Sequence, residues 1–319
     1  MTTSNAALFP PEIEAYRDRI DERLDAYSQL DSDCPDHLRE AIRYCLLAPG
    51  KRIRPLLVLT AAKICGGTIE NALPAACAVE MIHNYSLIHD DLPAMDDDDL
   101  RRGRPTVHIA YNEATAILAG DALQPLAFEH LSRQVSDPVR AVEAIRILAA
   151  AAGPERLVGG QADDLAAESS TKNKNSGSDP EQLCDAKRKE PIRTVEHLES
   201  IHRRKTGALF TASIEMGSVL SGAQANARQS VVSYASDLGL AFQVVDDLLD
   251  HVADENRLGK RVGKDIDRGK LTYPGLLGID GAREKAEHLI ESAMSHLELF
   301  GDAAWRLRWL AEYVLKRTH

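Results

Sequence analysis

The sequence lacks any apolar run that could cross a membrane, because no window approaches the roughly 18 apolar residues that a spanning helix needs. Its N-terminus lacks the basic and apolar segments of a secretory signal. The five cysteines show no Cys-x-x-Cys spacing, which favours reduced thiols over a disulfide framework or a zinc site. These absences predict a protein with no membrane span that is located in the cytoplasm.

Basic residues are also in the minority. Lys and Arg number 38 against 49 Asp and Glu, which gives a net charge of −11. No long basic stripe interrupts this excess, so we expect no nucleic-acid partner. The sequence also has no GxSxG, HExxH or GxxxxGK[ST] motif, which argues against hydrolases with a nucleophile-base pair and against P-loop ATP chemistry.

What is present indicates a helical globular protein. The 319 residues are 44% hydrophobic and 27% charged, which suffices for a large buried core. Few runs alternate with period two, so we predict an all-α fold in a single domain, residues 1–319. Residues 70–92 and 231–250 are apolar on most faces, which predicts central helices. The expected helices span residues 12–29, 36–47, 55–65, 70–92, 109–134, 138–153, 154–167, 194–221, 226–253, 274–280, 282–299 and 302–317.

One segment differs from the helices. Residues 168–193 are polar, contain Gly and two prolines, and have few large apolar side chains. We predict a long loop here, with a short helix after Asp179-Pro180 as an option. It is either a surface insertion or a lid over a functional site, because long loops in compact domains are often functional.

The stretch HDDLPAMDDDDLRRGRPTVH, from His89 to His108, is densely charged. It holds six aspartates between Asp90 and Asp99, followed by two arginines. Pro93 should distort the helix and allow Asp96 to converge with Asp90 and Asp91. Asp97 to Asp99 are expected to be solvated or paired with arginines. The plain alternative for the whole run is an acidic surface loop.

A second acidic cluster, DDLLD, lies on an apolar background. Asp246 and Asp250 are four residues apart and share a helix face, with Gln243 nearly on the same face. Like charges among apolar flanks need neutralisation, which argues against a merely solvated surface. Mg²⁺ held between these carboxylates and a polyphosphate would neutralise the negative charges, and arginines would bind the remaining phosphate oxygens.

Basic side chains accompany both clusters. Each alone would be an ordinary surface charge, but their joint occurrence favours phosphate binding. His83, seven residues before Asp90, would by itself be an ordinary core histidine. The basic residues are Lys51, Arg52 and Arg54 in GKRIRP, Arg101, Arg102 and Arg104 in RRGRP, and Lys205, Lys260 and Lys270.

Six motifs in this order resemble those of the trans-polyprenyl diphosphate synthases, most closely the bacterial farnesyl diphosphate synthases (geranyltranstransferases). The resemblance runs from about residue 12 to 317. It implies an all-α isoprenoid synthase fold, a helical bundle around a central active-site cavity, and a homodimer. The motifs are GKRIRP, HDDLPAMDDDDLRRGRPTVH, GGQADDL, HRRKTGALF, GLAFQVVDDLLD and GKDIDRGKLTYP.

The resemblance also implies a role for each matching residue. The metal ligands would be Asp90, Asp91, Asp96, Asp164, Asp246 and Asp250, holding about three Mg²⁺ ions per site once substrate is bound. The allylic diphosphate would be contacted by Arg101, Lys205 and Lys260, and isopentenyl diphosphate by Lys51, Arg54, His83 and Arg102. Gln161 and Lys270 would also bind substrate, while Thr206 and Gln243 would turn oxygen dipoles toward the allylic cation.

The implied reaction is a head-to-tail condensation of isopentenyl diphosphate with dimethylallyl and then geranyl diphosphate. It proceeds by ionisation, condensation and elimination, and gives farnesyl diphosphate. The cation needs a dry apolar cavity. The departing pyrophosphate can take the released proton, which accounts for the missing nucleophile-base pair.

Product length can be argued from Tyr85 and its small neighbour Ser86. Tyr85 is five residues before Asp90, roughly 7.5 Å deeper along a helix. Its ring would stop elongation at the C15 product, with a C20 (geranylgeranyl) product as the main alternative. Tyr85 could equally be an ordinary core aromatic.

Two other readings compete with chain elongation. A class I terpene cyclase shares the metal-assisted ionisation, but the basic residues beside both clusters favour a second diphosphate. A non-catalytic prenyl-diphosphate-binding subunit would be expected to lose motif aspartates, and none is missing.

Overall fold

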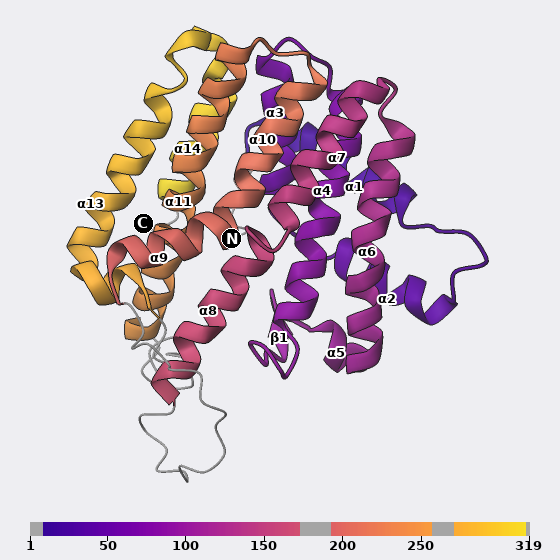
Figure 1. The fold of residues 1–319 in the computed structure, drawn as a ribbon, viewed down its shortest axis with the longest axis horizontal. Coiled ribbons are helices and arrows are strands. Elements are labelled where there is room, and N and C mark those ends of the chain that lie inside the picture. The colour runs from indigo at the N-terminus through magenta and orange to yellow at the C-terminus, as the bar shows by residue number, and fades with distance from the viewer. Residues whose placement is uncertain (1–8, 173–192, 257–270, 317–319) are drawn as a thin grey trace, which may run out of the picture. The chain divides into compact units, whose positions relative to one another are not determined.

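The structure is a computed structural model that describes residues 9–172, 193–256 and 271–316. As the sequence predicts, the described part is almost wholly helical (Figure 1). The elements are α1 (Pro11–Tyr27), α2 (Asp36–Leu46), α3 (Ile53–Ile64), α4 (Ile69–Asp90), β1 (Leu100–Arg101), β2 (Arg104–Pro105), α5 (Val107–Ala110), α6 (Glu113–Gln134), α7 (Pro138–Ala152), α8 (Leu157–Lys172), α9 (Val195–His202), η1 (Arg203–Gly207), α10 (Ala208–Leu220), α11 (Ala225–Asn256), α13 (Tyr273–Ser295), η2 (Glu298–Ala304) and α14 (Trp305–Lys316).

The chain forms two compact units. The first comprises Met1–Ala149 with Ala212–Val231, and the second comprises Ala150–Thr211 with Val232–His319. The expectation of a single domain over residues 1–319 stays a prediction.

The centre of the first unit is α4. It packs against α3 and α6, with α1 and α2 also in contact (Figure 1). Its side chains are buried all round between Ala72 and Ile82, which confirms a central helix. A helix that is apolar on every face can bury all of its side chains only when other helices surround it.

In the second unit α8 packs against α9 and the π-helical turn η1, while α13 packs against α9 and α14. The buried ring of Tyr234 on α11 donates its hydroxyl to the carbonyl oxygen of Leu307 on α14, at 2.7 Å. The prediction of an apolar central helix at 231–250 agrees with the buried side chains of Ala235, Leu238 and Val245 on α11.

Helix starts follow local side-chain chemistry. The hydroxyls of Thr68, Thr194 and Thr272 each accept a backbone N–H of the first turn that would otherwise lack a partner. Asp137 accepts from the backbone of Val139 at 2.9 Å, which confirms the predicted start of α7.

Several predicted helices differ from the observed ones in extent or regularity. The helix expected at 109–134 is interrupted, because Asn112 leaves the helix to cap α6. The helix expected at 194–221 contains the π-helical turn η1. Helix α8 continues to Lys172, into the predicted loop at 168–193, whose residues 173–192 lie outside the described part.

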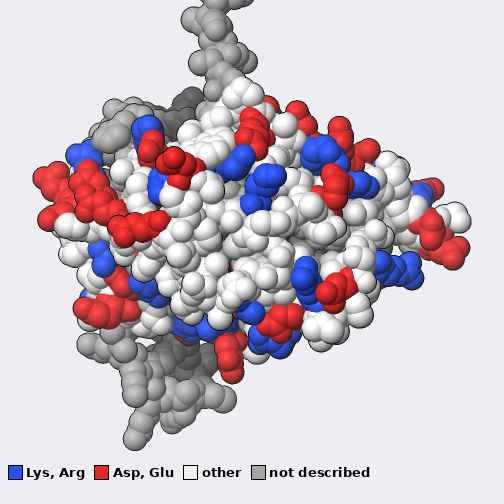
Figure 2. Space-filling view, turned by 90° about the horizontal axis from the view of Figure 1, so that it is seen from above, with Lys and Arg blue, Asp and Glu red and all other residues white. Residues whose placement is uncertain are grey.

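No helix in the described ranges is both long and apolar enough to span a bilayer. On the face drawn in Figure 2, acidic and basic side chains are interspersed over a largely uncharged surface.

Candidate functional site

The residues predicted to act on substrate lie in both units, and each group is described within its own unit. In the first unit they surround the C-terminal end of α4, where Asp90 is the last helical residue. The chain then turns back, and the backbone N–H of Asp96 donates to the carbonyl oxygen of Asp90 at 2.8 Å. This return brings Asp96 to Asp90, as the irregular spacing around Pro93 predicted. Both carboxylates are half-buried, whereas Asp97 and Asp99 are exposed.

The end of α4 is a place that favours cations. The helix dipole adds partial negative charge to its C-terminus, beside the carboxylates of Asp90 and Asp91. Asp91 is only 3% exposed and accepts three hydrogen bonds of 2.5–3.0 Å from Arg101. Burial raises the pKa of Asp91, and the Arg101 guanidinium acts in the opposite direction. Direct metal ligation by Asp91 would therefore require its carboxylate to turn away from Arg101.

Arg101 and Arg102 are presented by a hairpin that sequence reasoning missed. Strands β1 and β2 pair antiparallel, Arg101 opposite Arg104. Arg102 and Gly103, at φ 54° and 76°, connect them. Two positive φ angles in a two-residue loop are typical of a type I′ turn, and the Arg-Gly pair was the only local signal for it. The turn leaves Arg101 half-buried against Asp91 and Arg102 exposed at the tip.

A second basic contact links α3 to α4. The Arg54 guanidinium lies 3.1 Å from Nε2 of His83. Removal from water, followed by the charges of Arg54 and Arg102, lowers the pKa of His83 well below its usual value. His83 is therefore neutral near pH 7 and can accept from Arg54 through Nε2, which leaves the proton on Nδ1. Lys51, also predicted to bind substrate, is exposed before α3.

Some of the charged groups near the end of α4 border an open pocket within the first unit. Asp91, Arg101 and Arg102 line it together with the apolar side chains of Leu87 and Val107. Anion-binding guanidinium groups beside apolar surface suit a ligand with a diphosphate head and a hydrocarbon tail.

Tyr85 is a buried residue of α4. Its ring is 6% exposed and meets His89 edge-on, with ring centroids 5.8 Å apart. His89 is fixed in turn by a contact of 3.1 Å between its Nε2 and the carbonyl oxygen of Ile117 on α6. Burial, with the nearby charge of Asp90, raises the pKa of Tyr85 to about 12, so the ring stays neutral. Ser86 donates its hydroxyl to the His83 carbonyl oxygen at 2.9 Å.

In the second unit the predicted residues of α8 and η1 lie together. Lys205 Nζ donates to the Asp164 carboxylate at 2.6 Å. A Cβ on Gly160 would lie 2.4 Å from the backbone nitrogen of Lys205, so only glycine permits this close approach. Gln161 is 9% exposed, and its Oε1 has no hydrogen-bond partner among the described residues. A buried acceptor of this kind is suited to a ligand, a cation or water.

The π-helical turn also orients a polar chain on α11. Thr206 donates its hydroxyl to Oε1 of Gln243 at 2.9 Å, and Nε2 of Gln243 donates to Asp247 at 3.2 Å. Asp247 also accepts the backbone N–H of Tyr273 at 3.1 Å, at the start of α13. Asp247 thus fixes the orientation of the Gln243 amide, so that its oxygen faces Thr206. Sequence reasoning had assigned no role to Asp247. On the same helix Asp246 is half-buried, whereas Asp250 is exposed.

The carboxylates fit Mg²⁺ only in combination with a ligand. Within the described ranges no group of three or more His, Cys, Asp or Glu is arranged to hold a metal ion. Mg²⁺ typically takes one or two protein carboxylates together with waters and substrate phosphates, so a ready-made protein cage is not required. Asp90, Asp96 and Asp246, half-buried beside apolar helices, are the type of donor such an ion uses. Lys260 and Lys270 lie outside the described residues.

A family model described as polyprenyl synthetase matches residues 35–299. The chain belongs to the polyprenyl synthetase family. This polyprenyl synthetase is 43% identical over 312 residues to the farnesyl diphosphate synthase of Haemophilus influenzae, which covers 97% of this chain and 98% of that protein. It is 42% identical over 288 residues to the geranylgeranyl diphosphate synthase of Cyanophora paradoxa, covering 89% of each.

Its fold matches that of a solved FPP/GFPP synthase from Zymomonas mobilis, with a TM-score of 0.78 and 39% identity over 95% of this chain and 97% of that one. The polyprenyl synthetase thus has the all-α isoprenoid synthase fold. It is a prenyltransferase of isoprenoid biosynthesis, and its substrates are isoprenyl diphosphates.

Proposed function

We propose that this prenyltransferase condenses isopentenyl diphosphate with dimethylallyl and then geranyl diphosphate, and releases farnesyl diphosphate. The observation that carries the proposal is the end of α4 in the first unit. There the chain returns Asp96 to Asp90, Arg101 pairs with Asp91, and Arg54 contacts His83 on the same helix. Two sets of positive charge are what a reaction between two diphosphates requires.

The side chains of the first unit divide into two roles. Asp90 and Asp96, with Asp91 once released from Arg101, are proposed as Mg²⁺ ligands. Arg101 is then free to contact the allylic diphosphate, while Arg102, Arg54, Lys51 and His83 hold isopentenyl diphosphate. His83 takes part as a neutral donor through Nδ1, because its pKa is lowered.

The residues of the second unit are proposed to act on the allylic substrate. Lys205, Lys260, Lys270 and Gln161 bind it, and Asp164, Asp246 and Asp250 are proposed as further Mg²⁺ ligands. Thr206 and Gln243 direct oxygen lone pairs toward the carbon that becomes positive. Mg²⁺, when bound, stabilises the charge that builds on the departing pyrophosphate.

Tyr85 supports a farnesyl product. It is buried one and a half turns before Asp90, and His89 holds its ring in place. We infer that a fixed ring at this depth would block a longer chain along α4. A geranylgeranyl product is the second candidate, because relatives with that activity in their names are 42–45% identical to this chain.

The product distribution of Tyr85→Ala tests the chain-length proposal. Removing the ring should shift the product from farnesyl to geranylgeranyl diphosphate, because the space beneath the growing chain opens. Tyr85→Phe is the matched control, since it keeps the ring and should keep the farnesyl product. Mass spectrometry of products from geranyl and farnesyl diphosphate reads both variants. A wild-type product of twenty carbons, or an unchanged length in Tyr85→Ala, contradicts the role of Tyr85.

We further propose that the protein acts as a homodimer in the cytoplasm. Large apolar side chains are exposed on α6 (Ile117, Leu118) and α7 (Val139, Val142) of the first unit, which a second copy could cover. The four cysteines in the described part are free thiols, as a reducing compartment would leave them. Light scattering coupled to size-exclusion chromatography should give twice the chain mass of 34.9 kDa.

A further inference from the structure

The middle residue of the Lys51-Arg52-x-Arg54 run points away from the predicted substrate residues. Arg52 is 4% exposed and adopts a left-handed backbone conformation, φ 50°, immediately before α3. This conformation is uncommon for a residue with a side chain. It places Arg52 in the interior, whereas Lys51 stays exposed and Arg54 reaches His83.

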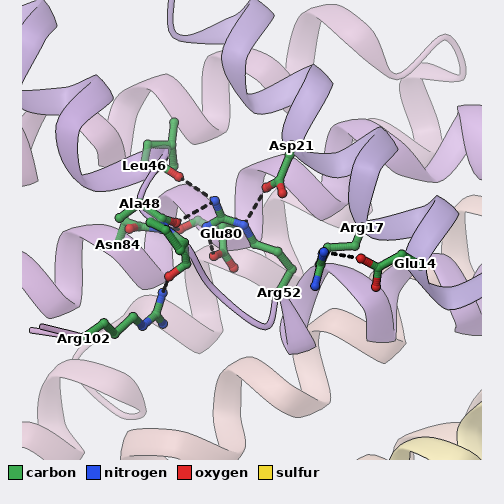
Figure 3. Close-up of polar contacts among 10 residues, drawn as sticks. Glu14, Arg17, Asp21, Leu46, Ala48, Arg52, Glu80, Asn84 and Arg102 are labelled. Carbon is green, nitrogen blue, oxygen red and sulfur yellow. Dashed lines mark hydrogen bonds and ion pairs between the residues drawn. The ribbon is translucent and has the colours of Figure 1, made fainter. Parts of the chain in front are cut away.

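The Arg52 guanidinium joins two acids to two backbone carbonyls (Figure 3). Its Nε donates to Asp21 on α1 at 2.8 Å, and Nη1 donates to Glu80 on α4 at 2.7 Å. Its Nη2 donates to the carbonyl oxygens of Leu46 and Ala48, each at 3.0 Å. Leu46 ends α2, so Arg52 also satisfies a carbonyl that the helix leaves without a partner. With its donors used internally, Arg52 is not placed to bind substrate.

The carbonyls held by Arg52 belong to the segment that holds Arg102. Arg102 Nη1 donates to the carbonyl oxygen of Pro49 at 2.9 Å. A Cβ on Gly50 would lie 2.5 Å from the same Nη1, so this segment fits closely around the guanidinium. The position of residues 46–50 therefore sets the position of Arg102.

We propose that Arg52 is a positioning residue for isopentenyl diphosphate binding, acting through Arg102 and Arg54 without touching substrate. The inference rests on the proposed function, in which these two arginines hold that diphosphate. Arg52 fixes the 46–50 segment on one side and the first turn of α3 on the other. Asp21 and Glu80 supply the charges that hold Arg52 itself, and Asn84 donates to the Glu80 carbonyl oxygen at 2.8 Å.

Arg52→Lys is the first test. Lysine keeps the charge but cannot reach both acids and both carbonyls, because it lacks the planar fork of arginine. The KM for isopentenyl diphosphate should rise about tenfold or more, with kcat and the KM for geranyl diphosphate close to wild type. Arg43→Lys is the control, since Arg43 also pairs with an acid, Asp25, in this unit and donates its other side-chain hydrogen bonds to Ser28 and the Asp25 carbonyl oxygen. Equal KM values in both variants would overturn the inference.

The double variant Arg52→Met/Glu80→Met separates positioning from stability. Arg52→Met alone leaves the Glu80 carboxylate, 2% exposed, buried without its partner and should unfold easily. Removing both charges should restore the melting temperature, since buried ion pairs can often be replaced by apolar side chains. The raised KM for isopentenyl diphosphate should persist. A KM that recovers together with the melting temperature would mean that the role is merely structural.

A crystal structure of the double variant tests positioning without relying on catalysis. We expect the Arg102 guanidinium to have left the Pro49 carbonyl oxygen. An unchanged Arg102–Pro49 bond overturns the inference even if the wild-type protein is active. A displaced Arg102 in a wild-type protein that makes no product would instead leave the positioning intact and refute the proposed function.

Discussion

His83 contributes to a basic site without carrying charge itself. Arg54 donates to its Nε2, and the surrounding guanidinium groups together with burial keep the imidazole neutral. A protonated imidazole could no longer accept this bond and would repel Arg54. The neutral form therefore orients Arg54. His83 does this as a hydrogen-bond acceptor and not as a positive charge.

This neutrality predicts a pH-dependent stability. Because the folded pKa of His83 is lowered, the unfolded chain takes up the proton first as pH falls below about 6.5, the usual histidine value. The stabilising contribution of neutral His83 is thus complete above that pH and is lost below it, by about 1 kcal/mol per pH unit. Unfolding by urea between pH 7.5 and 5 should show a smaller loss for His83→Gln than for wild type.

The matched control for this measurement is the exposed His288→Gln, which should follow the wild-type curve. His130, whose pKa burial lowers to about 4, titrates in all three proteins and cancels from the comparison. Identical pH slopes for wild type and His83→Gln would show that His83 is not held neutral.

At the scale of the elements, the packing of α8 against η1 depends on Gly160, which has no side chain. Gly160→Ala would set a methyl group 2.4 Å from the Lys205 backbone nitrogen. Overpacking should lower the free energy of unfolding by about 1–3 kcal/mol. It should also lower kcat, because the Lys205–Asp164 pair at this junction would shift.

Gly281→Ala on α13 is the comparison variant, since its Cβ would meet only Leu277 Cβ, at 3.1 Å. Its stability should stay within about 1 kcal/mol of wild type, because alanine favours the helix. Thermal unfolding and steady-state kinetics read both variants. A Gly160→Ala protein that matches the Gly281→Ala protein in both would argue against this close packing.

Most helices were predictable because their apolar periodicity and caps are local. The hairpin with Arg102 and the π-helical turn were not, because each depends on contacts from elsewhere in its unit. Arg102 is held by the Pro49 carbonyl oxygen, and Lys205 by Asp164. The spacing of apolar residues along the sequence does not reveal either of these two contacts.

The types of residue in the candidate site were predictable from the sequence, but the pairs that these residues form were not. The sequence named Asp91 and Arg101 separately, and the structure pairs them. It counted Arg52 among the basic residues of GKRIRP without assigning it a role, and the structure turns Arg52 inward through a left-handed backbone conformation. The available signal was Glu80, an acid within the apolar run of α4, which required a buried partner.

At the scale of the whole molecule, the net charge of −11 includes the aspartates that we propose as metal ligands. Each unit supplies aspartates, and each also supplies basic side chains. Such carboxylates repel one another without a cation, so both activity and part of the stability should depend on Mg²⁺.

Activity with defined substrates is the most direct test of the central proposal. Purified protein is incubated with Mg²⁺, isopentenyl diphosphate and either dimethylallyl or geranyl diphosphate, with a parallel sample in excess chelator. We predict pyrophosphate release and farnesyl diphosphate as the main product by mass spectrometry, and neither in the chelator sample. No pyrophosphate release with either allylic substrate in the presence of Mg²⁺ would contradict the account.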